Sequence, residues 1–365
     1  MSRDPASVGA QAVLASLLMS APAMPAQAFI GGSSSFRETA QKAVPIRDLG
    51  LTIAGTPLES VVATFERELE AAGITKLHPR FYLSTEWGVP YETIAIAIPF
   101  YLARPELTVL QAEQACHVEG SGPKDILRYL RHEMGHVVNY AYRLHETKEW
   151  SDRFGHMTRP YEEEYRPRPF SREFVHHLPG WYAQKHPDED WAETFAVWLT
   201  PGLDWRTQYG KWPGAMRKLD YCDRTMSEVM GKDPAVTTTE LDGDVASLSM
   251  SLEQYYRDSM GVLSESPQEL DEMLSTVFAD SEKSGVRLAA SDLSRKLERD
   301  LPASVFQWTG HMPERTRWLL DALAERADAQ TMTYRVDQAD AMTIALTSLV
   351  TALAMNWLQS GKYVP

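Results

Sequence analysis

The sequence predicts an α+β protein that is mostly helical, and three observations support this fold class. Apolar residues recur at helical spacing around residues 123–141, two short strand-like runs precede them, and helical patterns continue to the C-terminus. With 365 residues, 44% of them hydrophobic, the chain can bury a large core. The expected organisation is a small sheet with two helices over residues 46–225, followed by a C-terminal helical region over 226–365 packed on this core.

Residues 1–45 are rich in Ala, Ser, Pro and Gly, and two interpretations of them are open. The first is a disordered tail on a cytoplasmic protein. The second is a signal segment with an apolar stretch at 12–19 and cleavage after Ala28, which would make the protein exported or periplasmic. Arg3 is offset by Asp4, and Ser and Pro dilute the apolar stretch, so the tail is favoured.

Folded structure is expected from about Pro45. The run Thr56-Pro57-Leu58-Glu59 has the pattern of a capping box with Pro at the first helical position, and it predicts a helix that Gly73 ends. Two strand-like runs follow at 80–84 and 93–98, each bounded by Gly or Pro.

The central stretch is Arg131-His132-Glu133-Met134-Gly135-His136-Val137, an H-E-x-x-H pattern inside a predicted helix. Positions four apart share a helix face, so His132 and His136 can direct two imidazole nitrogens at one metal ion. Glu133 stands beside them, where its carboxylate can take a proton from a zinc-bound water. The alternative is a coincidental pair of histidines on an ordinary helix.

The third ligand must come from elsewhere in the chain. The extended motif H-E-x-x-H-x-x-G-x-x-H requires Gly and His at two further positions, where this chain has Asn139 and Tyr142. Residues 187–199 predict a second helix, with Pro in its first turn, acids at its N-terminal end and a Pro-Gly pair after it. Glu189 and Glu193 share one face of this helix, and a Glu from such a helix completes a His₂Glu zinc site.

The two glutamates have different expected roles. We expect Glu189 to bind the metal and Glu193, one turn later, to accept the N–H of a ligating histidine, because metal-bound histidines need such a partner. The reverse assignment is open. So is a purely electrostatic role, in which both acids only complement the helix dipole.

Two further segments are candidates for substrate contact. The strand at 94–98 is expected either to accept an extended substrate at a sheet edge or to pack half-buried on the metal helix. The segment 145–180 contains four histidines and several prolines, and it is expected to be a long irregular lid or specificity loop. Its histidines have no helical spacing to a second ligand, which favours surface or hydrogen-bonded roles.

Several stretches together resemble a bacterial family of zinc-binding metallopeptidases, and the likeness runs from about residue 50 to the C-terminus. They are the H-E-x-x-H stretch, the 188–199 segment, Glu86-Trp87-Gly88-Val89-Pro90, Ile98-Pro99-Phe100-Tyr101-Leu102, Tyr165-Arg166-Pro167-Arg168-Pro169-Phe170 and Gly180-Trp181-Tyr182-Ala183-Gln184. The resemblance implies a zincin-like core, one catalytic zinc ion and a peptide or protein substrate. Some relatives carry a Cys-rich zinc ribbon, which this chain, with Cys116 and Cys222 alone, lacks.

The run Glu189-Asp190-Trp191-Ala192-Glu193 is also similar to the Glu-aromatic-aromatic-Ala-Glu helix of lethal-factor-like and Pro-Pro endopeptidases, which are gluzincins. Asp190 departs from that pattern. The resemblance implies that Glu189 binds zinc and that Tyr182, seven residues earlier, donates its O–H to the oxyanion of the tetrahedral intermediate. The alternative for Tyr182 is a packing aromatic beside Trp181.

Charge and hydropathy limit the remaining function classes. A net charge of −14 argues against a nucleic-acid partner, because binding phosphates requires a basic face. The uncharged run 341–358 has about the length of a membrane span, but its Thr, Ser and Asn residues favour a buried bundle helix. The expected function is a zinc-dependent metallopeptidase; the alternative is a non-hydrolytic zinc-fold module that binds proteins with its helical C-terminal half.

Overall fold

The computed structural model describes residues 44–115, 118–161, 165, 167–168, 171–259, 267–278, 285–360 and 363. The expected tail or signal segment, apart from its last two residues, lies outside these ranges. So does Cys116, while Cys222 is buried and free.

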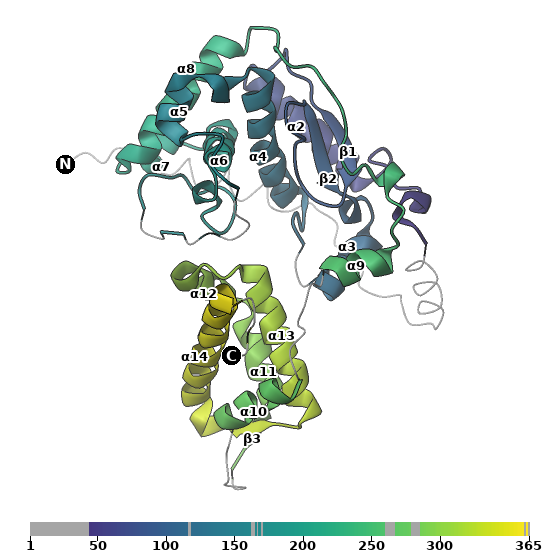
Figure 1. Cartoon of the computed structure of the whole chain (residues 1–365), viewed down its shortest axis with the longest axis vertical. Helices are drawn as coiled ribbons and strands as arrows, with labels where there is room; N and C mark the ends of the chain where they lie inside the picture. Colours follow the sequence, from purple (N-terminus) through teal and green to yellow (C-terminus); the bar gives the residue numbers. More distant parts are fainter. Residues whose placement is uncertain are drawn as a thin grey trace, which may run out of the picture. The chain divides into compact units, whose positions relative to one another are not determined.

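The described chain is mostly helical with two small sheets, which confirms the predicted class (Figure 1). Its α-helices are α2 (Pro57–Ala71), α3 (Pro105–Ala115), α4 (Pro123–Ala141), α5 (Lys148–Phe154), α6 (Pro187–Leu199), α7 (Trp205–Tyr209), α8 (Pro213–Val229), α9 (Leu252–Ser259), α10 (Pro267–Val277), α11 (Ala290–Leu297), α12 (Leu301–Thr309), α13 (Pro313–Ala329) and α14 (Ala339–Ser360). Short 3₁₀ helices are η1 (Ile46–Leu49), η2 (Phe100–Ala103), η3 (Leu144–Glu146), η4 (Tyr182–Gln184), η5 (Val245–Ser247) and η6 (Val336–Gln338). The strands are β1 (Arg80–Ser84), β2 (Ala95–Pro99), β3 (Arg287–Ala289) and β4 (Thr333–Arg335).

The strand β2 is buried along its whole length and has no free edge at its centre. It pairs in parallel with β1, with Arg80 opposite Ala95. On its other side the backbone N–H of Ala97 donates to the carbonyl of Gly88 at 2.8 Å. The expectation that the strand at 94–98 accepts a substrate is therefore wrong, because the outward N–H of its middle residue is already used.

The helices α4 and α6 cross at very close range, and a glycine permits this approach (Figure 1). A Cβ atom on Gly135 would lie 2.6 Å from the Cα of Ala192 and 3.0 Å from its carbonyl oxygen. At the same point the indole N–H of Trp191 donates to the carbonyl of Gly135 at 2.8 Å. The glycine inside the H-E-x-x-H pattern thus sets the distance between the two helices.

Two large hydrophobic clusters and two smaller ones lie in the interior of the described part of the chain. The first contains buried residues of α2, β2, α4, α6 and α8 and continues to Tyr256. The second begins at Leu270 and joins α10 to α14. The boundary expected at residue 225 falls inside α8. Residues 43–365 form one compact unit, in which the indole of Trp181 stacks on the ring of Phe306 with centroids 5.5 Å apart.

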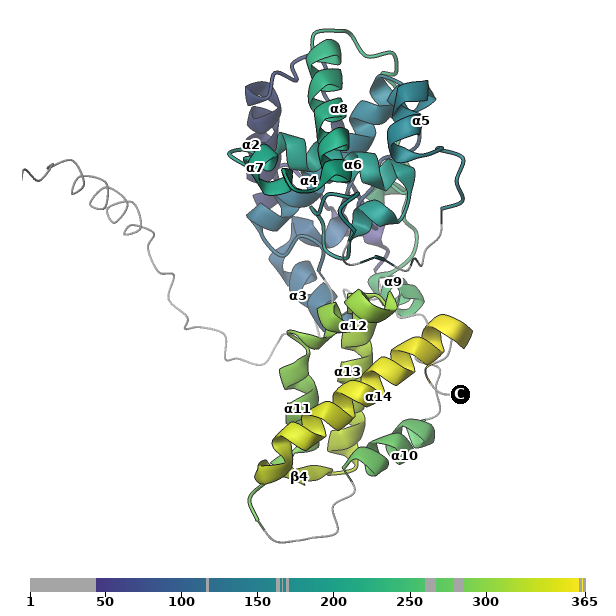
Figure 2. The same ribbon diagram turned by 90° about the vertical axis from the view of Figure 1, so that its left-hand side faces the viewer.

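The helix α14 buries only one of its faces. Figure 2 shows it crossing α13, and its buried residues are Leu346, Val350, Leu353 and Ala354. Ile344 on another face is 68% exposed. The prediction of a buried bundle helix is therefore wrong in extent, because a bundle of this size cannot cover both sides. By length and composition Val336–Leu358 could cross a membrane, and 22% of its most apolar window is buried.

We expect Gly135→Ala to destabilise the protein although alanine favours helices. The steric clash with Ala192 should cost about 1–3 kcal/mol, against a propensity gain of about 1 kcal/mol, so the net effect is a loss or at best no gain. Urea unfolding followed by circular dichroism measures it. Gly231→Ala, in the turn after α8 where an added Cβ meets nothing within 4 Å, is the control for the steric effect alone. A Gly135→Ala protein more stable than the control variant would contradict this account of the helix crossing.

A second prediction concerns His311, which is buried in the C-terminal bundle. Its Nδ1 lies 2.8 Å from the hydroxyl of Thr316 and its Nε2 lies 3.1 Å from the hydroxyl of Tyr363. Burial, with a smaller effect of the Arg315 cation, lowers the pKa of His311 from 6.5 to about 4. Between pH 6.5 and 4 the unfolded chain therefore binds a proton at His311 that the folded chain does not bind.

Stability should fall as the pH drops from 6.5 to 4, by up to about 3 kcal/mol from this residue. His311→Gln cannot take up this proton, so we expect its unfolding free energy to depend less steeply on pH over that range. Urea midpoints at pH 7 and pH 4.5 for both proteins measure the difference. Identical pH slopes would show that His311 is not the responsible group.

Candidate metal centre

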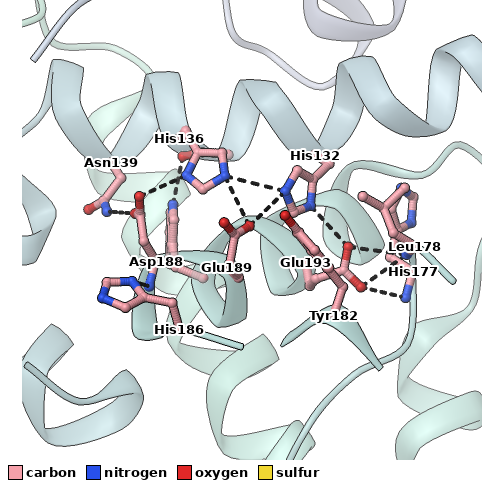
Figure 3. Close-up of polar contacts among 12 residues, drawn as sticks. His132, His136, Asn139, His177, Leu178, Tyr182, His186, Asp188, Glu189 and Glu193 are labelled. Atoms are coloured by element: carbon pink, nitrogen blue, oxygen red, sulfur yellow. Dashed lines mark hydrogen bonds and ion pairs between the residues drawn. The ribbon is translucent and has the colours of Figure 1, made fainter. Parts of the chain in front are cut away.

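Three side-chain atoms from α4 and α6 converge on one point (Figure 3). The Nε2 of His132 lies 3.0 Å from Oε2 of Glu189 and 3.3 Å from Nε2 of His136. The Nε2 of His136 lies 3.3 Å from Oε2 of Glu189. Ligands about 2.1 Å from a tetrahedral ion are about 3.4 Å from one another. Two imidazole nitrogens and one carboxylate oxygen are also donors that zinc accepts, so this group could hold a metal ion.

The geometry of the two helices brings these atoms together. His132 and His136 are one turn apart on α4, and Glu189 stands in the first turn of α6. All three residues are buried. The close crossing at Gly135 brings the first turn of α6 within reach of both histidines.

His132 is oriented by Glu193, whose side chain is completely buried. The Nδ1 of His132 lies 2.9 Å from Oε1 of Glu193. The backbone N–H groups of His177 and Leu178 also donate to the Glu193 carboxylate, at 2.9 and 3.0 Å. These contacts fix the carboxylate and leave Nε2 of His132 facing Glu189.

His136 has an orienting acid of its own, Asp188, which the sequence reasoning missed. The Nδ1 of His136 lies 2.9 Å from Oδ2 of Asp188. Asp188 also accepts hydrogen bonds from the Asn139 amide at 2.6 Å and the Tyr140 hydroxyl at 2.5 Å. Burial opposes ionisation of Asp188, but His136 and these hydrogen bonds outweigh it and hold its pKa below the usual value. The one signal in the sequence that could have indicated this role is the position of Asp188 directly before Glu189.

The site carries an excess of negative charge that a cation would balance. Burial disfavours the charged form of His132, yet the neighbouring Glu189 and Glu193 carboxylates raise its pKa to about 9. The pKa of Glu189 lies well below its usual value, because the two histidines outweigh its burial. A buried cluster of this kind attracts a proton or, better suited to its donors, a divalent ion.

Glu133 follows His132 in the sequence and lines the cavity, and its surroundings differ from those of Glu189. Burial raises the pKa of its carboxyl group, with Glu189 and Asp188 adding to the effect against the two histidines. Among the residues that the structure describes, none donates a hydrogen bond to the Glu133 carboxylate. This carboxylate is therefore free to accept a proton from a molecule in the cavity.

Tyr182 lies beside the metal group, on the 3₁₀ helix that precedes α6. Its ring centroid is 5.5 Å from that of His132. Burial and the nearby Glu189 carboxylate raise the pKa of Tyr182 well above its usual value, so the phenol keeps its proton. The sequence reasoning missed a second tyrosine, Tyr161, whose hydroxyl donates to Oε1 of Glu189 at 2.8 Å.

A cavity of about 530 Å³ opens above these residues, a size typical of ligand sites. Its lining includes Glu86, Trp87, Gly88 and Val89 on one side and Met312, Pro313 and Arg317 of the α12–α13 region on another. The start of α13 therefore forms part of the cavity wall.

The segment 145–180 is less irregular than expected. It contains part of η3 and all of α5. Two of its histidines make other contacts: Nε2 of His145 lies 3.3 Å from the Tyr91 hydroxyl, and Nε2 of His177 lies 2.9 Å from the carbonyl of Arg128. None of them belongs to the metal group found among the described residues.

A buried His-His-Glu group on two crossing helices could hold a metal ion, and part of the chain is similar to a known family. Residues 122–275, from α4 to α10, match the family described as "Putative zinc-binding metallo-peptidase". The match covers 154 of the 365 residues, less than half of the chain. No curated protein and no solved structure matches the chain.

Metal content tests the roles of the two glutamates. We expect Glu189→Ala to lose its metal, because one of three ligands is removed. Glu193→Ala should still bind one ion per chain, about 10–100-fold more weakly. Elemental analysis after dialysis, with zinc affinity measured against a chromogenic chelator, separates the two outcomes. The opposite pattern would make Glu193 the ligand.

Proposed function

We propose that the protein is a zinc-dependent metallopeptidase that hydrolyses peptide bonds, with one zinc ion held by His132, His136 and Glu189. The observation that carries this proposal is the convergence of these three side chains beside Glu133 in the cavity. The family match over residues 122–275 supports the same activity. The crossing of α4 and α6 beside a small sheet is consistent with a zincin-like core of the gluzincin type.

Glu133 is the proposed general base. Its raised pKa and its unpaired carboxylate suit a group that takes a proton from the attacking water and then delivers it to the leaving amine nitrogen. A bound zinc ion would supply the Lewis acidity that polarises the scissile carbonyl. The buried position of Glu133 excludes bulk water, which strengthens its interaction with the developing charge.

Tyr182 is the proposed donor to the oxyanion. Its phenol remains protonated, and its ring lies against that of His132 at the cavity wall. A hydrogen bond formed only in the transition state typically lowers the barrier by about 3 kcal/mol. Glu193 and Asp188 have the supporting role of holding the two imidazole rings in place.

The substrate is proposed to be a peptide or a protein. Residues 86–89 and residues of α13 both line the cavity, which is only partly enclosed, so we propose that it receives a stretch of peptide chain. This arrangement favours endopeptidase activity. The alternative is a non-hydrolytic module that binds proteins with its C-terminal bundle. Ile344 exposed on α14 favours it, but it gives no role to Glu133.

Glu133→Gln should retain zinc and lose peptidase activity by about 10²–10⁴-fold, because the amide cannot accept the proton. Activity is measured on a proteome-derived peptide library by mass spectrometry, and zinc by elemental analysis. Glu66→Gln, the same substitution at an exposed position of α2 outside the cavity lining, is the control and should remain active. Undiminished cleavage by Glu133→Gln would refute this mechanism, and a zinc-loaded wild type that cleaves no peptide would favour the binding module.

A further inference from the structure

Tyr161 connects the proposed metal ligand Glu189 with the proposed oxyanion donor Tyr182. It precedes α6 by a long stretch of chain and comes from the segment that follows α5. Its hydroxyl lies 2.8 Å from Oε1 of Glu189 and 3.3 Å from the hydroxyl of Tyr182. Its ring is 48% exposed, so burial of the ring alone does not explain why the hydroxyl reaches these partners.

The direction of these hydrogen bonds follows from the available protons. An ionised carboxylate can only accept, so the single proton of the Tyr161 hydroxyl is donated to Glu189. The oxygen of Tyr161 must then accept from Tyr182 across the 3.3 Å contact. The result is a chain of hydrogen bonds from Tyr182 through Tyr161 to Glu189.

The cation of Lys185 holds the two rings together. Its Nζ lies 4.4 Å from the ring centroid of Tyr161 and 5.4 Å from that of Tyr182. Lys185 is itself buried, which strengthens a cation–π contact. The ring of Tyr161 also lies 5.4 Å from that of His186, the residue that caps α6. These contacts place the Tyr161 hydroxyl independently of its hydrogen bonds.

We propose that Tyr161 is a positioning residue with two functions at this site. By donating to Oε1 of Glu189 it holds the carboxylate so that Oε2 faces the two histidines. By accepting from Tyr182 it keeps that hydroxyl turned toward the cavity until a substrate carbonyl replaces it as the acceptor. The second function rests on the proposed peptidase activity; the first concerns metal binding alone.

The variant Tyr161→Phe tests both functions, because it removes the hydroxyl and keeps the ring contacts with Lys185 and His186. We expect zinc affinity, measured against a chromogenic chelator, to fall about tenfold or more. We expect kcat to fall about tenfold with little change in KM. Tyr165→Phe is the matched control: its hydroxyl donates to the carbonyl of Gly180 and touches no metal ligand, so its zinc affinity should match the wild type.

A double variant identifies the route of the kinetic effect. If Tyr161 acts on catalysis through Tyr182, adding Tyr161→Phe to Tyr182→Phe should lower kcat at constant zinc saturation no further, while zinc affinity still falls. Unchanged zinc affinity in Tyr161→Phe would overturn the first function. Additive losses of kcat would overturn the second. The measurement of zinc affinity needs no substrate. It therefore tests the role of Tyr161 in metal binding even if the protein has no peptidase activity.

Discussion

The close crossing of α4 and α6 is the constraint on which the candidate site depends. Gly135 lies against the backbone of Ala192, and no side chain larger than hydrogen fits there without movement. This contact brings the first turn of α6 within reach of two imidazole rings on α4. A metal group of three ligands needs atoms placed to within a few tenths of an ångström, so the spacing of the helices matters as much as the identity of the ligands.

A second layer of acids gives the histidines their orientation. Glu193 and Asp188 each face the Nδ1 atom of one imidazole, and each is itself held by other donors. The donors differ: backbone N–H groups hold Glu193, whereas Asn139 and Tyr140 side chains hold Asp188. The two imidazole rings are thus held in place by groups on three separate parts of the chain.

The sequence predicted the parts of the site that follow local rules. The ends of α6 agree with its predicted range, because Pro187 begins it and a Pro-Gly pair follows it. The convergence of His132, His136 and Glu189 follows from helical spacing and from the donor set of zinc. Which glutamate binds the ion stays a prediction, although the observed distances agree with Glu189.

Other features depend on tertiary contacts and have no local signal. Tyr161 reaches Glu189 only through the path of an irregular segment, and Gly135 gains its role only when α6 lies on it. The outer side of β2 is taken by Gly88, which alternating hydrophobicity could not indicate. The extent of burial of α14 depends on how many neighbours the bundle supplies, which its own composition does not specify.

The stack of Trp181 on Phe306 connects the surroundings of the candidate site to the C-terminal bundle. Trp181 has a left-handed backbone with φ of 55°, an unfavourable conformation for a bulky residue, and it directly precedes Tyr182. The candidate metal ligands lie between residues 132 and 189, whereas Phe306, which stacks on Trp181 at this strained turn, belongs to α12. The candidate metal group therefore depends on residues 132–189, whereas the cavity lining also includes residues of α13. A molecule that binds the C-terminal bundle would therefore change which substrates enter the cavity. It would leave the affinity of the candidate metal group unchanged.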